Sequence, residues 1–137
     1  MRILAVDPGE KRLGVAISDQ TGTIANPLSV IIHVSRTLDA ARIASLADEH
    51  QVSRIIVGHA VGDCDQATPQ SRRASRLVIA IQGQTELPVE LWDESGSTQA
   101  AREARLAMGT SRRKRRGHLD DLAATYILQT YLDTIHP

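Results

Sequence analysis

The sequence is poor in aromatic residues and in cysteine, and each shortage excludes a class of protein. Phe is absent, and one Trp and two Tyr are the only aromatic residues among 137. No strand can therefore present the row of rings on which single-stranded nucleic acid stacks. The single cysteine, Cys64, excludes a disulfide framework and a cysteine zinc site. It also favours a reducing, cytoplasmic location.

Long apolar runs are missing as well. The N-terminus has no signal-peptide pattern and no stretch reaches the length of a membrane span, so we expect a soluble protein with no membrane partner. The 42% hydrophobic content comes almost wholly from short segments of Ala, Val, Ile and Leu, which suit an α/β architecture. The chain length fits one domain over residues 1–137.

The formal net charge is zero, but the charges are unevenly placed. The run RRKRR at 112–116 holds five of the 16 basic residues, so the rest of the chain carries 11 basic and 16 acidic ones. A concentrated cationic segment on a mildly acidic body suits contact with nucleic-acid phosphates. The alternative interpretation of such a run is a solvated loop.

The hydrophobic pattern predicts the element order β-β-β-α-β-α-β-α-α. The expected strands are ILAVD, LGVAIS, a third within 25–34 that Pro27 delays or places at an edge, SRIIVG and VELWDE. The expected helices span 37–50, about 69–81, 97–108 and about 119–132. This order implies a mixed five-stranded sheet, antiparallel at its start and parallel later, flanked by helices.

Two details of the helices are also predicted. The inner face of the first helix is expected to hold Leu38, Ala41, Ile43, Leu46 and Ala47. The basic run would form a mobile loop between Gly109 and the last helix, at the mouth of a site.

Acidic residues stand where the predicted elements end or begin. Asp7 ends the first strand, Asp93 and Glu94 end the fifth, and Asp120 and Asp121 lie in the first turn of the last helix. Ligand sites of open sheets gather beyond the carboxyl ends of the strands. Converging carboxylates repel one another unless a cation binds them, and oxygen donors suit Mg²⁺ or Mn²⁺. Two such ions, roughly 3.5–4 Å apart, would support phosphodiester hydrolysis.

Each of these carboxylates also has a plain structural interpretation. Asp7 can be a turn former, the pair at 93–94 can be solvated, and the pair at 120–121 can complement a helix dipole. Their joint placement favours the metal site. Neighbours on a strand face opposite ways, and neighbours on a helix lie about 100° apart, so only one member of each pair can face a single site easily.

Four segments resemble the YqgF family, the Holliday-junction-resolvase-like proteins also described as pre-16S ribosomal RNA nucleases. They are AVDPGEKRLGVAISD, RIIVG, LWDESGST and LDDLAATYILQTYLD, spread along nearly the whole chain. The resemblance implies a ribonuclease-H-like fold and a cytoplasmic nuclease that depends on a divalent metal. The family's three acidic residues fall on Asp7, Glu94 and Asp120, which we expect to bind metal and carry catalysis.

The implied partner is structured nucleic acid, either in 5′-end maturation of pre-16S ribosomal RNA or as a four-way DNA junction. The expected nucleic-acid contacts are Lys11, Arg12, Arg112, Arg113, Lys114, Arg115 and Arg116. The expected assembly is a monomer or a weak homodimer.

The chain departs from the family pattern beside the expected site. Ser95 stands where Arg is usual, and His59-Ala60 replaces a hydrophobic residue followed by Pro. These departures leave open a module that binds nucleic acid and cleaves it poorly. A phosphotransferase is a third interpretation, because Asp-x-Gly followed by a further Gly also opens the sugar-kinase and actin-like folds. Those folds need two such domains, and this chain has room for one.

Overall fold

The computed structural model describes residues 1–59, 68–93 and 112–136, and for 112–121 it describes the backbone alone. A five-stranded sheet with the order β3-β2-β1-β4-β5 lies at its centre. The strands are β1 (Ile3–Pro8), β2 (Arg12–Ser18), β3 (Ala25–Ile32), β4 (Arg54–His59) and β5 (Val89–Asp93). β2 is antiparallel to β1 and β3, whereas β4 is parallel to β1 and β5. The predicted mixed sheet is confirmed.

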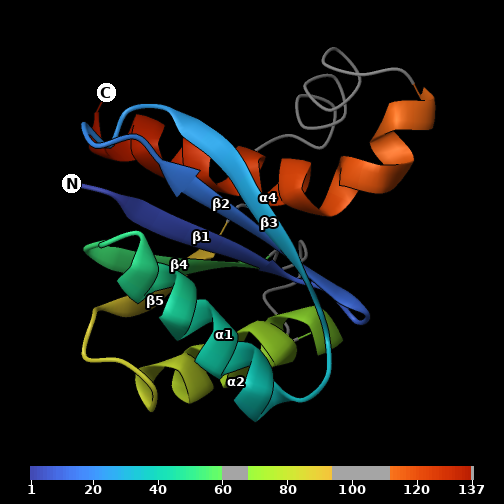
Figure 1. Ribbon diagram of the computed structural model, residues 1–137. Helices are drawn as coiled ribbons and strands as arrows, with labels where there is room; N and C mark the ends of the chain where they lie inside the picture. The colour runs from blue at the N-terminus through green and yellow to red at the C-terminus, as the bar shows by residue number, and fades with distance from the viewer. Residues whose placement is uncertain (60–67, 94–111, 137) are drawn as a thin grey trace.

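Helices cover both faces of this sheet. Helices α1 (Arg36–Glu49) and α2 (Pro69–Gln82) lie on one face and α4 (Arg112–Ile135) lies on the other (Figure 1). The helix predicted at 97–108 falls outside the described residues. Within the described part of the chain, no helix is both long and apolar enough to cross a membrane.

The central strand β1 is buried on both faces of the sheet, and its alternate residues belong to different cores. In β1, Leu4 and Val6 join the core under α1 and α2, whereas Ile3 and Ala5 join the core under α4. All four are fully buried, which explains why the strand is a continuous apolar run rather than an alternating one. The next odd-numbered residue of β1, Asp7, therefore lies on the face that α4 covers.

Proline places β3 at the border of the sheet, as predicted. Pro27 pairs with Ala16 beside a register shift between Val15 and Ala16, and β3 is an edge strand. A residue without an N–H is tolerated there because no second neighbour needs its hydrogen bond. The strand nevertheless begins at Ala25, before the proline rather than after it.

The predicted inner face of α1 is partly wrong. Leu38 is 41% exposed, whereas Asp39 is buried with only 2% of its surface exposed. The cause is polar: Asp39 accepts a hydrogen bond from the Val34 N–H (3.1 Å) and bonds the Nδ1 atom of His33. These bonds turn Asp39 inward, in line with Ile43 one turn later.

Helix α2 follows its prediction closely. It begins at Pro69 after the N-cap Thr68, whose side chain accepts from the Ser71 N–H while the Ser71 hydroxyl receives the Thr68 N–H. This reciprocal cap satisfies two backbone donors at the start of the helix. The buried residues of α2 include the four expected ones, Ala74, Leu77, Val78 and Ile81.

Helix α4 begins seven residues earlier than predicted. It starts at Arg112, so the basic run occupies its first turns and the expectation of a loop there was wrong. Arg and Lys are good helix formers, and the single Gly117 costs only about 1 kcal/mol in a helix interior. Asp120 and Asp121 are consequently in the body of the helix and not in its first turn.

Gly58 allows α4 to pack directly on β4. A Cβ atom at this position would lie 2.5 Å from Cδ1 of Ile127 and 2.9 Å from its Cγ2. Ile127 is itself fully buried in the core under α4. The side chain of Ile127 thus fills the space that any other residue at 58 would occupy.

We predict that Gly58→Ala destabilises the protein by about 1–3 kcal/mol, because the added methyl group overpacks this contact. Urea unfolding followed by circular dichroism measures the loss. Ile127→Val removes the nearest atom, Cδ1, and should recover part of the loss in the double variant.

The matched control is Gly83→Ala at the C-cap of α2. Gly83 has a helical φ of −75°, and an added Cβ would lie 3.4 Å from the Ala80 carbonyl oxygen. This change should be close to neutral. Equal stability of the two alanine variants would contradict the role assigned to Gly58.

Candidate active site at the carboxyl edge of the sheet

Asp7 lies at the edge of the sheet where the parallel strands end. It is the next-to-last residue of β1, half-buried, and pairs with Gly14 of β2. Since β4 and β5 run parallel to β1, their carboxyl ends reach the same edge. Asp7 therefore stands where ligands of open α/β sheets bind.

The turn after Asp7 is held tightly in place. A Cβ atom on Gly9 would lie 2.3 Å from the carbonyl oxygen of Arg12, so only glycine fits this turn without a backbone shift. The N–H of His33 donates to the carbonyl of Lys11 (2.9 Å) and ties the turn to the end of β3. Lys11 and Arg12 are exposed on it, which suits their predicted contact with phosphates.

The end of β5 approaches the same face through Trp92. Its Nε1–H donates to Oγ1 of Thr130 in α4 (3.0 Å), and its ring meets Tyr131 edge-on at 5.2 Å between centroids. Asp93, the last residue of β5, lies on the opposite side of the strand by the pleat. Glu94, the predicted ligand that follows it, is outside the described residues.

Helix α4 begins beyond this edge and runs across the sheet toward the starts of β1 and β4 (Figure 1). Arg54, at the start of β4, donates to the Tyr131 hydroxyl (2.7 Å), which donates to Glu90 in β5 (3.3 Å). The bond to Tyr131 is the main cause that raises the pKa of Arg54. Asp120 precedes Ile127 by seven residues, about two turns, so both positions share one face of α4.

The three predicted metal ligands are not all among the side chains that the structure describes. Asp7 is described, whereas Glu94 and the side chain of Asp120 are not. Among the described side chains, no group of three His, Cys, Asp or Glu residues could hold a metal ion. Carboxylate oxygens are of the chemical type that binds Mg²⁺ or Mn²⁺. The triad stays a prediction because two of its three side chains are not described.

A pocket on the other face of the same edge escaped the sequence reasoning. It has a volume of about 300 Å³ and lies between the β1–β2 turn, the start of α1 and α2. Its lining includes Glu10, His33, Arg36, Asp39 and Arg73. A signal for its buried acid was present, because Asp39, Ile43 and Ala47 follow one another at helical spacing of four residues.

Comparisons with known proteins identify the family of this chain. A family model described as "RuvX: Holliday junction resolvase" matches residues 1–134. The chain belongs to the RuvX family. This confirms the family resemblance carried by the four sequence segments.

Three relatives that match nearly the whole chain are each named "Putative pre-16S rRNA nuclease". The protein from Syntrophus aciditrophicus is 39% identical over 98% of this chain and 90% of its own length. The protein from Clostridium kluyveri is 37% identical over 98% of both chains. That from Thermoanaerobacter pseudethanolicus is 39% identical over 98% of this chain and 97% of its own.

Solved structures confirm the expected ribonuclease-H-like fold. Thermus thermophilus RuvC aligns with a TM-score of 0.65 at 11% identity, over 99% of this chain and 96% of its own. The fowlpox virus Holliday junction resolvase aligns with a TM-score of 0.57 at 20% identity, over 98% of this chain and 99% of its own. Nucleases of this fold generally use divalent metal ions.

Proposed function

We propose that this RuvX protein is a cytoplasmic, divalent-metal-dependent nuclease that processes the 5′ end of pre-16S ribosomal RNA. Residues 1–137 would form its nuclease domain. The observation that carries the proposal is the position of Asp7, half-buried at the carboxyl end of β1 on the face under α4. The enzyme class, a hydrolase of phosphodiester bonds, is that of the family.

Two placements support Glu94 and Asp120 as the partners of Asp7. Trp92 packs on α4, so the residue two positions later shares its side of the strand if the pleat continues. Position 120 shares a helix face with Ile127, which packs on the sheet. Both residues would then approach the face on which Asp7 lies.

The acidic triad would hold Mg²⁺ or Mn²⁺, in one or two ions. Bound metal would activate water and stabilise the leaving oxygen of a phosphodiester. The fold would position these ligands. The tight turn at Gly9 follows Asp7, and the hydrogen bond between Arg54 and Tyr131 holds α4, which carries position 120, against the sheet. Lys11, Arg12 and the basic run would hold the phosphates that flank the cut.

Ribosomal RNA is the favoured substrate because relatives that are 39% identical to this chain are named pre-16S rRNA nucleases. A four-way DNA junction is the second candidate, favoured by the name of the family model. A labelled precursor RNA fragment and a labelled four-way junction, each incubated with Mn²⁺, separate the two. Binding of both without cleavage of either would instead favour a non-catalytic module.

We predict that Asp7→Asn abolishes cleavage and leaves the fold intact. The substitution keeps the shape of the side chain and removes the charge that a metal needs. The readouts are cleavage of the preferred substrate in Mn²⁺ and the urea unfolding midpoint. An Asp7→Asn protein that cleaves like the parent would show that the site is elsewhere.

Within each acidic pair we predict that Glu94 and Asp120 matter more than Asp93 and Asp121. The strand pleat and the helical turn give the two members of each pair different directions. Glu94→Gln and Asp120→Asn should each reduce cleavage far more than Asp93→Asn and Asp121→Asn. The reverse order in rates measured at saturating substrate would overturn this assignment.

The basic run is predicted to supply affinity rather than chemistry. Each phosphate that is neutralised contributes about −0.7 to −0.9 to the slope of log affinity against log salt. Replacing three of the five residues at 112–116 by Gln, which suits a helix, should flatten the slope by roughly two units. Cleavage at saturating substrate should change much less. An unchanged slope would mean that nucleic acid does not contact this part of α4.

A further inference from the structure

The pocket on the α1–α2 face begins at the turn that follows Asp7. Pro8, Gly9 and Glu10 form one side of it, and Arg36 and Arg73 reach it from α1 and α2. Its volume of about 300 Å³ is large enough to admit a phosphate group with part of its sugar. The pocket and the proposed catalytic edge are thus separated by a single turn of the chain.

One side of this pocket is built from fixed polar groups. Both carboxylate oxygens of Asp39 are engaged, one by the Val34 N–H and the other by the His33 ring. Asp39 is only 2% exposed, so its charge is directed at these partners rather than at solvent. The His33 N–H also holds the Lys11 carbonyl, which connects this wall to the turn.

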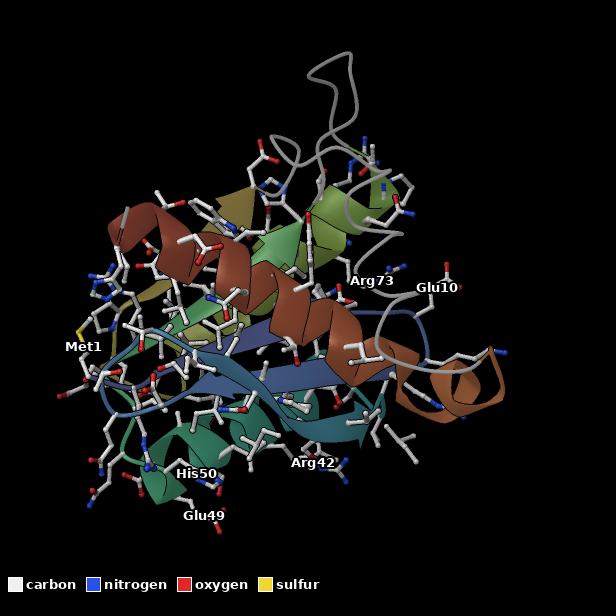
Figure 2. All side chains as sticks on the ribbon, turned by 90° about the horizontal axis from the view of Figure 1, so that it is seen from above. Met1, Glu10, Arg42, Glu49, His50 and Arg73 are labelled. Atoms are coloured by element: carbon white, nitrogen blue, oxygen red, sulfur yellow. The ribbon has the colours of Figure 1, made fainter. Side chains whose placement is uncertain are left out.

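On the cationic side of the pocket, the ion pair that Arg73 forms within the described part of the chain is long. Nη2 of Arg73 lies 3.5 Å from Oε1 of Glu10, and the side chains are 31% and 79% exposed. Figure 2 shows the two residues on the same side of the molecule, Glu10 on the turn and Arg73 on α2. An ion pair with so exposed a carboxylate is weak and easily exchanged. Arg36 lines the same pocket at the start of α1, where the helix dipole also favours an anion.

We infer that this pocket binds a backbone phosphate of the nucleic-acid substrate, and that Glu10 occupies Arg73 until the phosphate replaces it. The inference rests on the proposed nuclease function and extends the substrate path beyond the catalytic edge. A guanidinium group matches a phosphate with two parallel hydrogen bonds, which a distant carboxylate cannot reproduce.

The position of the pocket suits a continuous path for one strand. If a nucleic-acid strand is cleaved beside Asp7, the phosphates next to the cleaved bond would pass over the turn on which Lys11 and Arg12 are exposed. On the α1–α2 face, Arg36 and Arg73 line the pocket together with Pro8, Gly9 and Glu10 of that turn. Glu10 then acts as a local competitor that weakens binding without touching the reacting phosphate.

The test is Glu10→Gln, measured as binding to a labelled hairpin RNA and a labelled four-way DNA junction in EDTA, where no metal-dependent cleavage occurs. Removing the Glu10 carboxylate should tighten binding about threefold at low salt. It should also steepen the slope of log affinity against log salt by the contribution of about one phosphate, roughly 0.7–0.9. Arg73→Gln should weaken binding by a similar factor. The double variant should bind like Arg73→Gln, because Glu10 acts through Arg73.

Two matched controls separate this effect from net charge. Glu49→Gln makes the same charge change at the far end of α1, away from the pocket (Figure 2). Arg76→Gln makes the same change as Arg73→Gln one turn later on α2, at an exposed position outside the pocket lining. Tighter binding by Glu49→Gln to the same extent, or a Glu10→Gln gain that persists without Arg73, would overturn the inference.

Cleavage by the parent protein in Mn²⁺ is measured in parallel and reports on the proposed function alone. A parent that cleaves while Glu10→Gln binds no more tightly than the parent refutes the pocket and leaves the nuclease in place. A parent that binds but does not cleave refutes the nuclease, and the Glu10 and Arg73 variants still decide the pocket.

Discussion

The contact between Gly58 and Ile127 is the constraint on which the rest of the arrangement depends. With no side chain at 58, α4 lies against the middle of the sheet, and the hydroxyl of Tyr131 fixes the far half of the helix over the starts of β4 and β5. The direction of α4 is then set, and its first half extends toward the edge where Asp7 stands. A larger residue at 58 would lift the helix and separate the elements that carry the proposed ligands. The placement of the proposed metal ligands therefore depends on core packing as well as on the acidic residues themselves.

The β1–β2 turn gives the same edge two faces. Asp7 points under α4, whereas Pro8 and Glu10, close by in sequence, belong to the pocket beside α1 and α2. The turn is tight, because a Cβ atom on Gly9 would collide with the Arg12 carbonyl oxygen, and the Lys11 carbonyl accepts a hydrogen bond from the His33 N–H. Such a turn can hold the Asp7 carboxylate on one face of the sheet and expose the cations of Lys11 and Arg12 beside it. Chemistry and affinity can thus be supplied by a few consecutive residues without flexible parts.

Much of the fold could be predicted from the sequence because its signals are local. Continuous apolar runs marked the strands, Pro27 marked an edge, and the start of α2 was expected at about residue 69, where it lies. The inner face of α1 could not be predicted from apolar spacing, because a buried hydrogen bond between Asp39 and His33 decided it. The start of α4 was misjudged because a charge run was taken for a loop, although Arg and Lys favour helices. For the site, Asp7 was predicted at its observed edge, whereas the pocket with Arg73 depends on tertiary contacts between α2 and a distant turn.

The early start of α4 changes what its charges can mean. Positive residues in the first turn of a helix oppose the macrodipole, so each residue of the basic run there is unfavourable by about 0.3–1 kcal/mol unless an anion compensates it. Without such an anion the helix dipole makes Arg112 and Arg113 unfavourable at this position, and a bound phosphate backbone would supply the anion. The same start removes the structural explanation for Asp120, because the dipole effect fades after the first turn and Asp120 is the ninth residue of α4. Helix α4 thus has cations in its first turn, where the helix dipole favours anions, and it has Asp120 at a position where the dipole does not favour an acidic residue. Both departures are explained together if a metal and a polyanion meet at this end of the sheet.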